Sequence, residues 1–179
     1  FQGAADRVDF VSSIARAPNG DLYLAGTATQ EGSAHRLVVT RLSGVHGFEL
    51  GSATWPTPAG SSWVLGAEVQ GDWRLVLAGR TTALDGDSDL FTMARRIPGL
   101  ELDPLYNDPS DFDPLSYVSL DLPGFADELV AFGFCFDDGR PLIAGYATPD
   151  HNDVQPFVVR LENAYIFADG FESGDRSAW

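Results

Sequence analysis

A short apolar string that ends in Ala-Gly returns three times in this chain and constrains its fold more than any other feature. The copies are Leu22–Gly26 (LYLAG), Leu75–Gly79 (LVLAG) and Leu142–Gly145 (LIAG). Their Ala-Gly pairs are 53 and 66 residues apart, which suits repeated four-stranded units joined by loops of variable length. Three such copies predict a repeat protein in which each string is one strand of a larger unit.

The residues around each string complete a four-strand pattern. A turn signal precedes each string, and a polar loop and an apolar run ending in arginine follow it. Gly and Pro recur too often for long helices, and no amphipathic stretch of a dozen residues is present. The sequence therefore predicts an all-β fold of three four-stranded antiparallel blades in a β-propeller-like array. The blades are expected at about residues 9–55, 61–122 and 127–171.

The ends of the chain fall outside this repeat domain, which is assigned to residues 4–161. Residues 1–3 (FQG) are interpreted as a tag remnant, with a natural mature N-terminus as the alternative. Residues 162–179 are expected to hold a final strand and a C-terminal tail.

The strings and their neighbours differ in hydrophobic pattern. The strings are continuously apolar, as expected for inner strands packed on both faces, whereas residues 48–55 and 115–122 alternate and predict outer strands. The Ala-Gly pair permits close approach of a neighbouring backbone. Residues 98–114 contain four prolines and five acidic residues and predict an irregular acidic loop.

The Asp-Gly turn, the LxLAG strand and the Arg-Leu ending resemble the bacterial delta-60 repeat family. The match extends over nearly all of residues 9–161 and is clearest in the third unit, at Asp138-Gly139, Ile143–Gly145 and Val158–Leu161. Trp73 near the expected turn glycine and the Arg95-Arg96 pair depart from the pattern. The resemblance implies four-stranded propeller-like blades, often in secreted or surface-anchored proteins. The tail, from Ile166 (IFADGFESGDRSAW), resembles a segment common in exported proteins of gammaproteobacteria.

Three blades do not close a propeller, because propellers usually have at least four. Three arrangements remain open: the C-terminal part of a longer propeller, two copies paired in a six-bladed ring, or an open arc with protected ends. We favour a homodimer, because exposed blade faces are expected to find a partner.

Charge limits the classes of partner. The chain has 26 acidic residues against 11 Lys+Arg, all of them Arg, and a formal net charge of -15. Nucleic acid and anionic membrane surfaces both demand a basic footprint, so neither is expected as a partner. No apolar run is long enough to insert as a transmembrane helix. The single cysteine, Cys135, lies in an apolar run and is interpreted as a buried inert thiol.

Acidic residues in the loops are the candidate metal ligands. Asp85, Asp87 and Asp89 alternate in one loop, a spacing by which carboxylates can wrap Ca²⁺. Arg96 stands where an EF-hand would carry its twelfth-position Glu, so the loop is not an EF-hand, and turn chemistry is the competing interpretation. A second cluster contains too few ligands for a convincing zinc site; it comprises Asp150, His151 and Asp153.

Residues for catalysis and sugar binding are weaker candidates. The carboxylates of the acidic loop can be paired for glycoside hydrolysis only if two of them face one another across a cleft; they are Asp103, Asp108, Asp111 and Asp113. The large aromatics can stack on sugars, but core packing is their more common role; they are Tyr23, Trp55, Trp63, Trp73 and Tyr146. Recurrent arginines are interpreted as structural partners of an aspartate or carbonyl in a neighbouring blade; they are Arg41, Arg160 and either Arg95 or Arg96.

These patterns favour a non-catalytic, secreted or cell-surface module. Its expected contacts are with a protein or a surface glycan, through the loops at 27–36, 81–89 and 148–153 on one face. The alternative is a carbohydrate-binding or glycoside-hydrolysing propeller that uses aromatic and carboxylate side chains.

Overall fold

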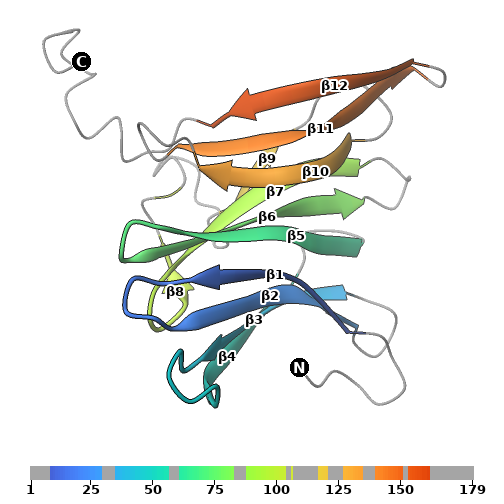
Figure 1. Cartoon of the computed structure of the whole chain (residues 1–179). Coiled ribbons are helices and arrows are strands. Elements are labelled where there is room, and N and C mark those ends of the chain that lie inside the picture. The colour runs from blue at the N-terminus through green and yellow to red at the C-terminus, as the bar shows by residue number, and fades with distance from the viewer. Residues whose placement is uncertain are drawn as a thin grey trace, which may run out of the picture.

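The computed structural model describes residues 9–29, 35–56, 61–82, 88–103, 106, 117–120, 127–134, 140–150 and 153–161. These residues form three antiparallel β-sheets that stack face to face in chain order (Figure 1). The prediction of an all-β chain with antiparallel sheets is confirmed. Within the described ranges, the structure contains no helix that could cross a membrane.

The first and third sheets follow the chain in simple up-and-down order. The first contains β1 (Phe10–Arg16), β2 (Leu22–Thr29), β3 (His35–Leu42) and β4 (Glu49–Pro56). The third contains β10 (Asp127–Phe134), β11 (Pro141–Asp150) and β12 (Asp153–Arg160). A fourth strand expected for the third unit, at 164–171, lies outside the described residues.

The second sheet has five strands rather than the four expected. They are β5 (Ser61–Gln70), β6 (Arg74–Thr82), β7 (Ser88–Arg96), β8 (Glu101–Leu102) and β9 (Tyr117–Leu120), and both β8 and β9 pair with β7. The interpretation of residues 98–114 as wholly irregular was wrong at β8. Its two residues lie between prolines and pair with Arg95 and Arg96, so the acidic segment begins with a short strand.

The Ala-Gly pair marks a β-bulge in each sheet. The register of the first hairpin shifts opposite Ala25-Gly26, and the same shift recurs opposite Ala78-Gly79 and Ala144-Gly145. A Cβ added to Gly26 would overlap the carbonyl oxygen of Phe10, and one added to Gly79 would overlap that of Trp63. The bulge brings a neighbouring carbonyl onto the glycine, so no larger residue fits there.

The first and second sheets share the main hydrophobic core. The inward faces of the first sheet and of the second meet in one cluster of buried side chains. Its largest members include Tyr23, Leu37, Leu75, Leu77 and Phe91. We call this contact the first seam.

Hydrogen bonds that join β1 and β2 to β5 fix the register of the first seam. The Ser13 hydroxyl accepts from the amide of Ala67 at 3.0 Å, and Ser12 donates to the carbonyl of Val64 at 2.5 Å. The Thr27 hydroxyl accepts from the amide of Val64 at 3.2 Å. Polar side chains of the first sheet therefore satisfy backbone groups of the second, which apolar packing alone would leave unpaired.

The second and third sheets meet in a smaller cluster. It contains Ala78 and Leu90 from the second sheet and Ile143 from the third, with Phe157 and Leu161 packed against it. The middle sheet is thus covered on both faces, and β6 is almost wholly buried, whereas burial alternates along β11. This difference follows from position in the stack, because among the described residues each end sheet packs against another sheet on one face.

Candidate interaction site

The loops expected to form the contact region leave the sheets on one side of the stack. The ends of β2 and β3, of β6 and β7, and of β11 and β12 lie on the right-hand side of Figure 1, and the tight turns between β1 and β2 and between β5 and β6 lie on the left. We call these the loop side and the turn side. Residues 30–34, 83–87 and 151–152, which form the centres of the loops, lie outside the described residues.

The calcium prediction falls mostly outside the described residues. Asp85 and Asp87 lie outside the described residues, whereas Asp89 is described and lies half-buried in β7, where its backbone pairs with Thr81. His151 also lies outside them, between Asp150 at the end of β11 and Asp153 at the start of β12. Over the ranges that the structure describes, no three His, Cys, Asp or Glu side chains gather as a metal site. The prediction of calcium at Asp85, Asp87 and Asp89 stays a prediction.

Three side chains cluster at the loop side of the first seam. Trp63 of β5 pairs across the strands with Arg80 of β6, whose guanidinium carbon lies 5.4 Å from the Trp63 ring centre. His35, the first residue of β3, brings its ring centre to 4.9 Å from that of Trp63, tilted by 40°. We call this the Trp63 cluster.

The Trp63 cluster combines accessible aromatic surface with a cation that keeps bonding capacity. All three side chains are half-buried. The Nε of Arg80 is shielded from solvent and has no hydrogen-bond partner. A guanidinium has five donors in a planar fork and retains its charge, so Arg80 can donate hydrogen bonds to a carboxylate or carbonyl of a partner. Sequence reasoning treated Trp63 as core and did not single out Arg80, because the contact depends on strand pairing.

The recurrent arginines have structural partners, but not the expected ones. Arg41 donates from Nε and Nη2 to the carboxylate of Asp21, at 2.9 and 2.6 Å. This hydrogen bond with Arg41 is the main reason why the pKa of Asp21 is lowered. The two residues belong to the same sheet, so the expectation of a partner in a neighbouring blade was wrong for Arg41. Arg95 does cross the first seam, where its guanidinium lies 4.6 Å from the ring centre of Trp55.

Asp103 of the acidic segment belongs to a buried ion pair and is not an open carboxylate. Asp103 is fully buried, and its Oδ2 accepts from Nε of the equally buried Arg74 at 2.5 Å. The exposed Arg96 approaches its other oxygen at 3.5 Å. A glycosidic acid must be open to a substrate, so Asp103 does not fill that role. Asp108, Asp111 and Asp113 lie outside the described residues, as does Cys135.

Register explains why the ion pair of the second sheet differs from that of the first. Gly26 pairs with Val38 and Gly79 with Phe91, and alignment on these pairs places Arg74 at the position of Asp21 and Ala94 at the position of Arg41. The second sheet therefore carries the positive charge where the first carries the negative one. Asp103 provides the compensating carboxylate from beyond β8.

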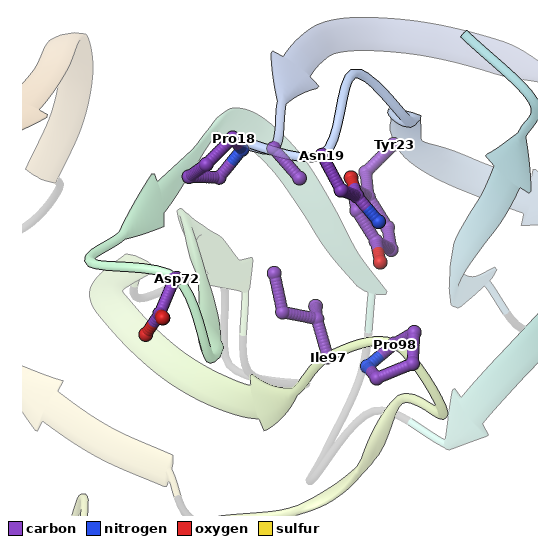
Figure 2. Close-up of a pocket in the computed structure, with 7 residues that line it drawn as sticks. Pro18, Asn19, Tyr23, Asp72, Ile97 and Pro98 are labelled. Atoms are coloured by element: carbon purple, nitrogen blue, oxygen red, sulfur yellow. The ribbon is translucent and has the colours of Figure 1, made fainter.

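A pocket of about 290 Å³ opens at the turn side of the first seam. Figure 2 shows its lining, which comes from the β1–β2 turn, the β5–β6 turn and the residues after β7. The Asn19 side chain donates from Nδ2 to the Asp21 carboxylate and accepts at Oδ1 from the backbone amide of Asp21. Tyr23 is buried, its hydroxyl has no hydrogen-bond partner, and burial raises its pKa. The lining is thus mixed in polarity and offers few groups that could fix a ligand.

The other aromatics are divided between core and surface. Tyr23 is wholly buried and Trp55 packs against the core, as their interpretation as packing residues requires. The ring centre of Trp73 lies 4.1 Å from the guanidinium carbon of Arg74. Tyr146 is 44% exposed on the outward face of the third sheet.

Comparisons with known proteins place this chain in no family. No protein-family profile matches it, and a search of curated proteins finds no match.

Proposed function

We propose that this chain is a non-catalytic module of a secreted or cell-surface protein, built from propeller-like β-blades, that binds a protein through its loop side. The observation that carries the proposal is the Trp63 cluster. It lies on the side from which the loops leave the sheets, at the seam between two sheets. Rigid strands hold its three side chains, so the ordering cost of binding is small.

The composition of the cluster suits protein recognition. Tryptophan and arginine are the residues most often found to dominate the binding energy of protein interfaces. Arg80 also supplies positive charge to a chain whose formal net charge is -15. An acidic or carbonyl-rich segment of a partner can approach this point with less repulsion than it meets elsewhere on the surface.

The same geometry disfavours the glycan alternative. Sugars stack on an open aromatic face, but His35 and Arg80 already lie against the Trp63 ring. Among the four candidate aspartates of the acidic segment, Asp103 is the one that the structure describes, and it is buried and ion-paired. Protein contact therefore requires no rearrangement of the cluster, whereas sugar stacking does.

The test compares variants of the cluster on two kinds of probe. The immobilised chain is challenged with purified bacterial envelope proteins and, separately, with a glycan array. We expect binding in the protein arm, weakened at least about tenfold by Arg80→Glu and by Trp63→Ala, since hot-spot truncation costs about 2 kcal/mol or more. Val45→Glu is the matched control, because Val45 is 83% exposed in the turn at the other end of β3. Binding in the glycan arm alone, or equal loss in all three variants, would contradict the proposal.

A further inference from the structure

The outward faces of the two end sheets expose apolar side chains. On the first sheet, Val11 and Ile14 are 47% and 63% exposed beside the half-buried Leu24, and we call this the N-end face. On the third sheet, Val158 is 74% and Tyr146 44% exposed beside Leu142 and Ala144, and we call this the C-end face. Neither face is turned toward the second sheet, since Tyr23 and Ala25 or Ile143 and Phe157 fill the inward positions.

Register relates the C-end face to the first sheet's half of the first seam. Val158 pairs with Ala144 as Val39 pairs with Ala25, at the same distance from the Ala-Gly glycine. Val39 and Ala25 are fully buried in the first seam. The C-end face therefore repeats the apolar side chains by which the first sheet packs on the second.

The N-end face corresponds in the same way to the second sheet's half of that seam. Val11 pairs with Gly26 as Val64 pairs with Gly79, and Ile14 pairs with Leu24 as Ala67 pairs with Leu77. Val64, Ala67 and Leu77 are buried in the first seam. Each end face thus carries one half of an interface that this chain already forms internally.

We propose that the C-end face of one copy packs on the N-end face of a second copy, and that two such contacts close a ring of six sheets. Counterparts across the new seam differ in size at several positions. Ile14 is larger than its counterpart Ala67, and Leu142, which pairs with Arg160, is smaller than Tyr23, which pairs with Arg41. Burial of the two faces removes their exposed apolar side chains from water, which is the dominant drive for association.

The partner is a second copy because both complementary halves lie on the same chain. A head-to-tail contact between different faces either closes into a ring or continues as a filament. Three stacked sheets span half of a six-bladed propeller, so two copies suffice for closure. The contact does not involve the Trp63 cluster, so it stands or falls separately from loop-side binding.

The first experiment measures the mass of the full chain by light scattering at micromolar concentration. We expect twice the 19.3 kDa of one chain. Since each copy has a formal charge of -15 and the faces are apolar, raising the salt should strengthen the association. A monomer at all concentrations would overturn the proposal, and so would a mass that grows without limit, because the ring would then not close.

Variants test which faces meet. Ile14→Lys and Val158→Glu should each reduce the mass to that of one chain, and the double variant should recover the doubled mass, because opposite charges then meet at both contacts. Val45 is 83% exposed and lies away from both faces, so the mass of Val45→Glu should remain that of two chains. If Val158→Glu reduces the mass to one chain and Ile14→Lys does not, the C-end face pairs with itself, which also overturns the proposal. Circular dichroism and thermal melts verify that each variant folds.

Discussion

Removal of the Asp103 carboxylate tests the account of the second sheet most directly. Asp103 is fully buried, and its partner Arg74 is 1% exposed. In Asp103→Ala the guanidinium remains in the interior with Gln70 as an acceptor at 3.0 Å and with the rings of Trp73 and Tyr106 nearby. Its Nη2 already has no hydrogen-bond partner, so the site has little capacity to compensate.

The expected loss follows from the burial of the charge that is left behind. Breaking a buried ion pair by removing one partner costs about 3–5 kcal/mol, mainly because the remaining charge is uncompensated. The contact of Asp103 with Arg96 adds little, since Arg96 is largely exposed. For a domain of this size the loss corresponds to a fall of roughly 6–20 °C in Tm.

The assay is thermal and urea denaturation of matched variants. Asp72→Ala serves as the control, because Asp72 is an exposed aspartate in the neighbouring turn, and it should change the stability by less than about 0.5 kcal/mol. The double variant Asp103→Leu with Arg74→Met removes both charges and should recover most of the loss. A loss below about 1 kcal/mol for Asp103→Ala, or a double variant less stable than the single one, would refute the account of a buried pair.

Two further predictions concern the bulge and the alkaline limit of stability. Gly79→Ala should lower the free energy of unfolding, measured by urea denaturation, by about 1–3 kcal/mol, because the new Cβ would overlap the carbonyl of Trp63. Gly51→Ala should leave the free energy of unfolding unchanged, because the space around Gly51 is open. Burial raises the pKa of Tyr106 from 10.0 to about 12, so its contribution to stability is present below pH 10 and is lost as the pH rises toward 12. Tyr106→Phe should reduce the stability lost over that interval by on the order of 2–3 kcal/mol, and an unchanged pH profile would contradict this.

Local pattern was enough to predict the strands, because their apolar strings and turn residues are adjacent in sequence. The Ala-Gly string gave the position of β2, β6 and β11, and the close approach expected at its glycine is present at Gly26 and Gly79. What pattern did not reveal is the bulge that causes the approach. The bulge adds one residue to the strand before the string. This extra residue cannot be recognised from the spacing between the two strands, because the turn that joins them varies in length.

Ionic partners were harder to predict, because they depend on which strands become neighbours. Arg41 was expected to reach another blade but pairs with Asp21, which lies twenty residues earlier in the chain and beside it in the sheet. Asp103 read as one of several acidic loop residues, yet it neutralises Arg74. The signal that would have separated it from the others is the pair of apolar residues around it that are also buried, Leu100 and Tyr106.

The first two sheets carry different side chains at equivalent repeat positions. The first seam combines apolar packing with side-chain hydrogen bonds from Ser12, Ser13 and Thr27, whereas the equivalent positions in the second sheet are Leu65, Gly66 and Arg80. One repeat position therefore serves as register-fixing polar contact in the first sheet and as part of the Trp63 cluster in the second. Arg80 thus departs from the hydroxyl side chain that the first sheet carries at this position. A repeat position released from packing is where a binding residue can arise without loss of the fold.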